Sequence, residues 1–309
     1  MDSSKIKVAV VQATPVLFDL EATVNKICEL IEEAQKGRAQ LVLFPEAFIP
    51  CYPRGLSFGT VVGSRSKEGR DVWLKYWENA LDIESDYTRQ ISGAIKTAGI
   101  HCCIGITERE ETSGTLYCSL LFWGPDGKIL GRHRKLKPTA AERIIWGEGD
   151  GSTLNVYNTD IGKIGGLVCW ENYMPLARMA LYQQKVEFYL APTADQRPGW
   201  LSSMQHIALE GRCFVLSCNQ FVRKEDYPEE LKKELEDANE VLCTGGSVII
   251  SPLGEILAGP LHGEEGILFA ELDKRDIIKA KMDFDVIGHY HRPDVFEFSY
   301  KGAKKIDKT

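Results

Sequence analysis

The chain alternates short apolar runs with amphipathic helical patterns, and this alternation is the feature that most restricts its fold. Residues 7–13, KVAVVQA, have the apolar run of a buried strand, and residues 20–36 repeat apolar side chains every three to four positions, as a helix does. Asp19 is a suitable N-cap for that helix. A second buried strand, LVLF, follows at residues 41–44. This β–α–β order predicts a layered α/β fold.

The same alternation continues toward the C-terminus. It predicts further strands at residues 102–107, 116–123, 154–157, 163–169, 187–191, 213–218, 247–251 and 266–271. It predicts further helices at residues 86–97, 174–184, 200–210 and 274–282. Two turn sequences, GPDG at 124–127 and PLG at 252–254, follow predicted strands and favour β-hairpins. We therefore expect antiparallel as well as parallel strand pairs.

Composition and charge limit the class of protein. Of the 309 residues, 44% are hydrophobic and 26% are charged, as in globular proteins. The net charge of −7 argues against nucleic acid or an anionic membrane as a partner. No apolar stretch approaches the roughly 20 residues that span a bilayer, and the first apolar run is broken too early for a signal peptide. We predict a cytoplasmic protein with one domain over residues 1–300 and a short, disordered basic tail over residues 301–309.

The cysteines and histidines give no sign of a disulfide framework or a metal site. The chain has nine cysteines, an odd number, and no pair has the C-x-x-C spacing. Most of these thiols are expected in the core, where free cysteine is common. His289 and His291 lie two residues apart without an evident third ligand. The sequence therefore predicts no bound metal.

Residues 224–240, KEDYPEELKKELEDANE, form the one break in composition. Glu229 and Lys233 have the i,i+4 spacing of a helical ion pair. Two interpretations are open: a helix that binds a partner, and a solvated helical insertion. We favour the insertion, because runs of charge usually face water.

Residues 55–59, GLSFG, match the G-x-S-x-G pattern of a nucleophilic serine at Ser57. That motif requires a buried strand directly before it and a helix directly after it. Pro50 and Pro53 precede it here, and TVVGS follows. We therefore regard a serine hydrolase as a weak alternative.

Three reactive side chains each follow an apolar run. Glu46 follows LVLFP, Cys169 follows IGGLV, and Lys135 follows LGRHR at residues 130–134. Singly, they are typical of a loop carboxylate, a core thiol and a surface lysine, and their spacing does not bring them together. Together they would supply a base, a nucleophile and a cation. A thiol near pKa 8.5 needs such a base at neutral pH, and the cation would stabilise developing negative charge.

The segments around these residues resemble the nitrilase superfamily of carbon–nitrogen hydrolases. The resemblance extends from residue 8 to residue 293, and its blocks include FPE, RKLKPT and CWE, each in the family's order. The Cys-Trp-Glu form is similar to the true nitrilase branch, whereas aliphatic amidases more often carry Cys-Tyr-Asp. The resemblance implies a four-layer α-β-β-α sandwich. It also implies that Cys169 is the nucleophile, Glu46 the general base and Lys135 the stabilising cation, with Glu142 positioning the lysine and the substrate.

The activity that the resemblance implies is hydrolysis of a small-molecule nitrile to a carboxylic acid and ammonia. The intermediates would be a thioimidate and then a thioester on Cys169, and no metal or organic cofactor is required. Three alternatives share the fold: an amidase, an enzyme that releases the amide, and a non-catalytic binding or assembly protein. The family pairs through its outer helices, so we expect a homodimer or larger homo-oligomer. Many members have a longer C-terminal extension that contributes to assembly, which leaves spiral formation open.

Several residues near these blocks are predicted to bind substrate. They are Tyr52, Trp146, Trp170, Tyr173, Pro192 and Thr193. Aromatic residues are equally typical of cores and of pockets, so these assignments have two interpretations. An aryl or arylaliphatic nitrile would suit aromatic walls. Residues 191–195 and 220–221 resemble plant-type nitrilases, some of which act on cyanoalanine, so a small polar nitrile stays open as well.

Overall fold

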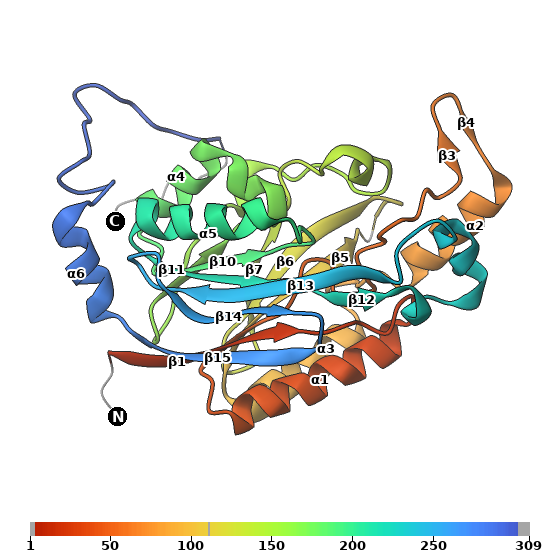
Figure 1. The fold of residues 1–309 in the computed structure, drawn as a ribbon, viewed down its shortest axis with the longest axis horizontal. Helices are drawn as coiled ribbons and strands as arrows, with labels where there is room; N and C mark the ends of the chain where they lie inside the picture. The colour runs from red at the N-terminus through yellow and green to blue at the C-terminus, as the bar shows by residue number, and fades with distance from the viewer. Residues whose placement is uncertain (1–3, 111, 302–309) are drawn as a thin grey trace.

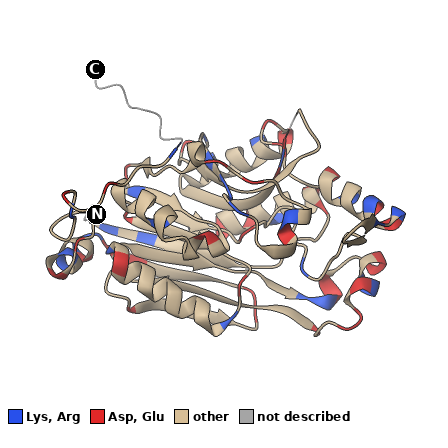
Figure 2. Cartoon of the chain, turned by 90° about the horizontal axis from the view of Figure 1, so that it is seen from above, with Lys and Arg blue, Asp and Glu red and all other residues tan. Residues whose placement is uncertain are grey.

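The computed structural model of the protein describes residues 4–110 and 112–301. Two β-sheets lie face to face, and helices cover the outer face of each one (Figure 1). Most of the charged residues lie on helices and loops, whereas the strands are largely uncharged (Figure 2). The predicted basic tail lies outside the described residues except for Lys301.

The first sheet has six strands in the order β15-β1-β2-β5-β6-β7. Strand β1 pairs in parallel with β2, and β2 with β5, whereas the other neighbours are antiparallel. Strand β7 therefore runs in the same direction as β2 and β5. The strands are β1 (Lys5–Gln12), β2 (Leu41–Leu43), β5 (His101–Arg109), β6 (Leu116–Trp123), β7 (Ile129–Arg134) and β15 (Gly266–Asp273).

The second sheet has the order β12-β13-β11-β10-β9-β8, with β14 paired to β13. Its central strands β9, β10 and β11 are parallel. The strands are β8 (Tyr157–Asn158), β9 (Lys163–Gly166), β10 (Phe188–Pro192), β11 (Phe214–Cys218), β12 (Phe221–Arg223), β13 (Val241–Ile250) and β14 (Ile256–His262). A separate short hairpin joins β3 (Thr60–Val61) to β4 (Ser64–Arg65).

Helix α2 (Lys67–Glu78) was not predicted, whereas the other helices of the described residues follow the predicted amphipathic patterns. Asp19 caps α1 by accepting a hydrogen bond from the Ala22 N–H at 2.9 Å, as its position predicted. Both predicted hairpin turns, 124–127 and 252–254, join antiparallel strands. The helices are α1 (Leu20–Lys36), α2 (Lys67–Glu78), α3 (Asp86–Ala98), α4 (Pro175–Gln183), α5 (Pro198–Gly211) and α6 (Arg275–Asp283).

Strand alternation explains the layers. In β1, Val8 and Val10 pack between the two sheets, whereas Ala9 and Val11 pack against helices α1 and α3. The second sheet does the same: Leu216 faces the first sheet and its neighbours in β11 face α4 and α5. The three resulting apolar clusters separate four layers, so the predicted α-β-β-α sandwich is confirmed (Figure 1).

Three predicted strands are wrong in extent, and the one predicted at 247–251 begins six residues after the start of β13 (Val241–Ile250). Strand β9 ends at Gly166, three residues before Cys169, which instead begins the 3₁₀ turn η3 (Cys169–Tyr173) with a φ of 50°. The apolar run continues past the strand because this turn is itself buried. Of the predicted strand 154–157, only Tyr157 belongs to β8, and residue 154 follows another 3₁₀ turn, η2 (Gly151–Thr153).

The segment 224–240 is not the solvated helix that its charge predicted. It forms the 3₁₀ turns η4 (Lys224–Asp226) and η5 (Glu229–Leu235), and Lys232, not Lys233, pairs with Glu229 in the ion pair described there. Three apolar side chains of the segment are buried. They belong to the apolar cluster between the two sheets, which also includes residues of the loop after β2. The three side chains are Tyr227, Leu231 and Leu235. The charged residues between them mask this apolar face in the sequence.

Within residues 4–110 and 112–301, every helix is too short or too polar to cross a membrane.

Gly105 in β5 is predicted to be indispensable for close packing against the loop after β2. A Cβ there would lie 2.1 Å from the Pro45 carbonyl oxygen and 2.6 Å from the Glu46 Cα. Gly105→Ala should therefore lower the free energy of unfolding by about 1–3 kcal/mol, as overpacking does. Gly93→Ala is the matched control, because a Cβ at this exposed position of α3 meets no described atom within 4 Å. It should raise the free energy of unfolding by about 0.5–1 kcal/mol. Urea denaturation would measure both, and equal effects would contradict the prediction.

Candidate active site

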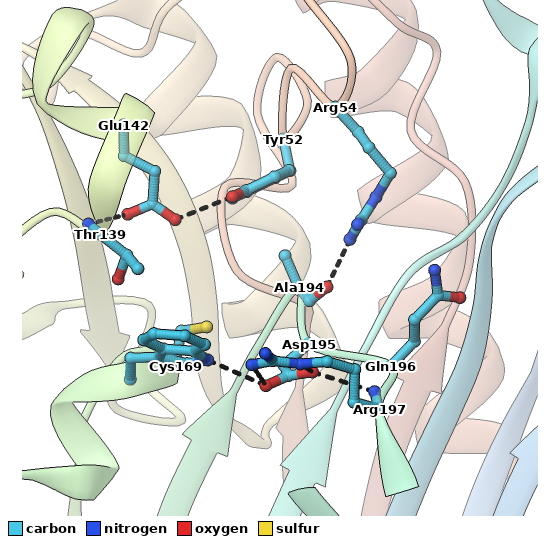
Figure 3. Close-up of a pocket in the computed structure, with 10 residues that line it drawn as sticks. Tyr52, Arg54, Thr139, Glu142, Cys169, Ala194, Asp195, Gln196 and Arg197 are labelled. Carbon is cyan, nitrogen blue, oxygen red and sulfur yellow. Dashed lines mark hydrogen bonds and ion pairs between the residues drawn. The ribbon is translucent and has the colours of Figure 1, made fainter. Parts of the chain in front are cut away.

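A pocket of about 300 Å³ opens where strand ends from both sheets meet (Figure 3). Glu46 lies three residues after β2, Lys135 directly after β7, and Cys169 three residues after β9. The pocket is lined by Tyr52, Arg54, Thr139, Glu142, Cys169, Trp170, Ala194, Asp195, Gln196 and Arg197. The sandwich thus brings together side chains that are far apart in the sequence.

Lys135 is fully buried and lies between two carboxylates. Its Nζ donates to Glu46 Oε1 and to Glu142 Oε2, both at 2.7 Å. Burial opposes the charge of the ammonium, but the carboxylates outweigh this effect and hold the pKa of Lys135 well above its usual value. The lysine is therefore a fixed cation beneath the pocket.

The two carboxylate oxygens of Glu46 have different surroundings. Oε1 accepts from Lys135 and, at 3.6 Å, from the thiol of Cys118, whereas Oε2 has no hydrogen-bond partner among the described residues. Burial raises the pKa of Glu46, and Lys135 opposes this rise. Gln220 Nε2 donates to the Glu46 backbone carbonyl at 2.9 Å and fixes the loop. One oxygen is thus anchored while the other is available to a proton donor.

The Cys169 thiol lies at the base of the pocket and is only 4% exposed. Thr193 Oγ1 donates to Cys169 Sγ at 3.1 Å, and the backbone N–H of Ala194 also interacts with the sulfur. Burial, and then the charge of Glu46, raise the pKa of Cys169 to about 12, although Lys135 opposes them. The resting group is therefore a thiol, which needs a base before it can attack an electrophile.

Glu142 connects the lysine with the pocket wall. Its Oε1 accepts from the Tyr52 hydroxyl at 2.8 Å (Figure 3). Its Oε2 accepts from the Thr139 backbone N–H at 2.7 Å as well as from Lys135. Glu142 lies in the 3₁₀ turn η1 (Ala140–Ile144), so this turn, the lysine and the loop after β2 are held together by one side chain.

The outer wall carries two arginines in different electrostatic states. Arg197 forms a 2.5 Å ion pair with Asp195, which also accepts from Trp170 Nε1 at 2.8 Å. Arg54 donates to the Ala194 backbone carbonyl, and its guanidinium lies 5.3 Å from the Tyr52 ring centroid. Arg54 therefore contributes to this wall a guanidinium whose side-chain hydrogen bond goes to a backbone carbonyl and not to a carboxylate.

These outer residues were missed by the sequence analysis. Arg54, Asp195, Gln196 and Arg197 all line the pocket. Their signal was available, because they lie in the loops that follow predicted strands at the same edge as Glu46 and Cys169. Polar loop residues are common, however, and nothing in their local pattern distinguishes them.

Of the predicted substrate-binding residues, Tyr52 and Trp170 line the pocket. Thr193 contacts the thiol from below. Trp146 lies behind the lysine, with its ring centroid 5.8 Å from Lys135 Nζ, and thus supports the site instead of lining it.

The structure places the other two predicted substrate-binding residues outside the lining. Pro192 is buried at the end of β10, where it pairs with Cys218 of β11. Tyr173 is exposed and packs edge-on against Trp170, with 5.7 Å between ring centroids. Its position one turn beyond the cysteine directs it to the surface.

The alternative sites are not supported by the described residues. Ser57 is exposed, and its hydroxyl donates to Glu234 Oε2 at 2.8 Å. His289 and His291 are also exposed. In the part of the chain that the structure describes, no group of three or more His, Cys, Asp or Glu side chains is arranged to hold a metal ion.

Comparison with known proteins agrees with this geometry. The family model described as carbon-nitrogen hydrolase matches residues 7–282. An aliphatic nitrilase of Sinorhizobium fredii is 48% identical over 295 residues, which cover 95% of each chain. A bifunctional nitrilase/nitrile hydratase of Lupinus angustifolius is 48% identical over 302 residues, covering 96% of this chain and 86% of the relative.

Solved structures share the fold at lower sequence identity. The crystal structure of a carbon–nitrogen hydrolase from Helicobacter pylori has a TM-score of 0.74 at 21% identity, covering 95% of this chain and 97% of that one. Nit3 of Saccharomyces cerevisiae, a member of the nitrilase superfamily, has a TM-score of 0.73 at 22% identity, covering 93% and 97%. These structures share the fold, and the family match with the 48% identical relatives shows that the chain belongs to the carbon–nitrogen hydrolase family, in its nitrilase branch.

Proposed function

We propose that the protein hydrolyses a small organic nitrile to the carboxylic acid and ammonia. The observation that carries this proposal is the buried Lys135, held at 2.7 Å by both Glu46 and Glu142 next to the pocket that contains the Cys169 thiol. The names of the most similar curated relatives, an aliphatic nitrilase among them, support the same reaction.

In the proposed first half-reaction, Glu46 takes the proton of Cys169 as the sulfur attacks the nitrile carbon. The C–S bond forms while one π bond of the C≡N group becomes a lone pair on nitrogen, and transfer of the proton from Glu46 to that nitrogen gives a thioimidate and frees the carboxylate. Lys135 stabilises the charge that develops, a type of interaction worth about 3–4 kcal/mol in transition states. The raised pKa of the thiol is the reason that this step needs a base.

The second half-reaction has two possible products. Water, deprotonated by Glu46, adds to the thioimidate and gives a tetrahedral intermediate. Cleavage of its C–N bond releases ammonia and leaves a thioester, which a second water hydrolyses to the acid. Cleavage of its C–S bond instead regenerates the thiol and releases the amide. The lupin relative is named for both activities, so amide release is our second candidate function.

The pocket favours a small polar nitrile over a bulky aryl one. Its volume of about 300 Å³ lies at the lower end of the range for small-molecule sites. Tyr52 and Trp170 are the aromatic members of the lining, and the charged side chains of Arg54, Asp195 and Arg197 form the outer wall. We therefore propose a nitrile with an acidic or polar group, such as a cyano acid.

We also propose that residues 1–300 form one catalytic domain and that the chain assembles as a homodimer or a larger homo-oligomer. Exposed apolar side chains on the outer helices support assembly: Leu176 on α4 is 71% exposed and Leu209 on α5 is 40% exposed. The cytoplasmic location stays a prediction from the sequence.

Cys169→Ala is expected to abolish hydrolysis, with a fall in kcat of at least about 1,000-fold, because no other group can form the covalent intermediate. Cys213→Ala is the matched control, since this equally buried thiol packs between the second sheet and its helices. Ammonia release should be measured on a panel of nitriles and matched amides, with identification of the products. Activity on amides alone would show an amidase, and equal activity of both variants would contradict a role for Cys169.

The pH dependence of kcat/KM should report the ionisation of the Glu46 carboxyl group. The base must be ionised, so kcat/KM should be lost as the pH falls through the pKa of Glu46. Because burial raises that pKa, the acid limb should lie above about 4.3, the ordinary value for glutamate. A limb at or below the ordinary value in wild-type protein would contradict this assignment of the base.

Arg54→Gln tests the charge of the outer wall. The variant should raise KM for 3-cyanopropionate about tenfold, as loss of one charge-assisted hydrogen bond does. It should change KM for 3-cyanopropionamide, which has the same size and no charge, less than about twofold. Steady-state kinetics on both compounds measure the effect, and an equal change for the two would rule out recognition of a carboxylate by Arg54.

A further inference from the structure

Glu171, two residues after the cysteine, is buried and accepts four hydrogen-bond contacts. Its Oε1 accepts from the Leu136 backbone N–H at 2.7 Å, and its Oε2 accepts from the Val168 backbone N–H at 2.7 Å. His133 Nε2 lies 3.1 Å from both oxygens. Glu171 is not one of the residues that line the pocket.

These partners are the chain neighbours of the two reactive residues. Leu136 directly follows Lys135, and Val168 directly precedes Cys169. The lysine segment leaves the first sheet after β7, and the cysteine turn leaves the second sheet after β9. One carboxylate therefore joins the backbone of the two sheets at the point where each presents its reactive side chain.

The turn at Cys169 needs such a contact. Cys169 has a φ of 50°, a left-handed conformation that costs a non-glycine residue about 1–3 kcal/mol in general. The bond from the Val168 N–H to Glu171 caps the 3₁₀ turn η3 that holds this conformation. The hydrogen bond from Val168 to Glu171 therefore also helps to fix the direction in which the Cys169 sulfur points.

The geometry points to Glu171 as a positioning residue that fixes the distance between Lys135 and Cys169. This inference rests on the proposed function, because it assigns a role in the same reaction. Glu171 acts through backbone atoms and does not contact the substrate. His133 contributes a third donor from β7, which keeps the carboxylate in one orientation.

The electrostatic state of Glu171 agrees with this role. Burial opposes the charge of the carboxylate, but His133 and the two backbone N–H groups outweigh burial and lower the pKa of Glu171. The group is therefore an ionised double acceptor at neutral pH. A protonated carboxyl or an amide would offer only one good acceptor to the two N–H groups.

Glu171→Gln tests the inference with almost no change in volume. The amide nitrogen would face one of the two backbone N–H donors, so either the lysine segment or the cysteine turn loses its acceptor. We expect kcat to fall about 100-fold, as small misplacements of reacting groups do, and KM to change less than about threefold. Glu187→Gln is the matched control, because Glu187 also accepts a backbone N–H, from Lys163 at 2.8 Å, at the other end of β9. It should retain wild-type kcat.

The pH profile separates positioning from mere stability. Lys135 lowers the pKa of Glu46, so displacement of the lysine should move the acid limb of kcat/KM to higher pH in Glu171→Gln. An unchanged limb, with activity reduced only in proportion to the folded fraction, would overturn the inference. If the variant does not fold, Glu171→Asp provides the same comparison, since it keeps both acceptors and the charge but is one methylene shorter.

Alkylation distinguishes failure of this inference from failure of the proposed function. Iodoacetamide labelling of Cys169, quantified by peptide mass spectrometry across pH, requires no nitrile turnover. An inactive wild-type protein whose Cys169 labelling is slowed by Glu171→Gln would refute nitrile hydrolysis and keep the positioning role. An active wild type whose kinetics and labelling are unchanged by Glu171→Gln would refute the positioning role alone.

Discussion

A lysine without exposed surface can keep its charge only when other groups replace the water around it. In this protein, Glu46 and Glu142 do so for Lys135. Each carboxylate comes from a different loop, so the ammonium group obliges those loops to close around it. The geometry that the proposed chemistry needs is therefore the same geometry that makes burial of the charge tolerable. Removal of either partner would leave the ammonium with a single carboxylate and one loop without its contact to the lysine.

Buried polar side chains also hold the backbone near the site. Glu142 accepts from the Thr139 N–H, Glu171 accepts from two backbone N–H groups, and Gln220 donates to the Glu46 carbonyl. The loops around the site are thus fixed by buried polar contacts in addition to their apolar packing. Two face-to-face sheets provide the rigid base, and these contacts determine where each strand's last residues point.

The layered fold was largely predictable because its signals are periodic. Helix α1 and strand β6 have the predicted bounds, since each buries one regular face or lies wholly in the interior. Helix α2 was missed because few of its residues are buried, and β14 because it lies largely exposed at a sheet edge. The apolar contacts of residues 224–240 were missed because their partner, the loop after β2, is distant in sequence.

The site was predictable only in part, for a related reason. Glu46, Lys135 and Cys169 were selected as residues that follow apolar runs, and the family resemblance suggested that they act together. The structure shows their proximity, whereas the sequence pattern had no means to do so. Arg54 and Asp195 were missed although they follow predicted strands, because their importance comes from the pocket that they line and not from their neighbours in the chain.

The pairing of β15 with β1 has a consequence for the order of folding during synthesis. Residues 266–273 cover the edge of residues 5–12 in an eight-residue antiparallel register. While the ribosome is still making the middle of the chain, that edge of β1 has no strand beside it, and exposed edges promote association between chains. Nascent protein therefore depends on β15, made late in synthesis, to shield the edge of β1.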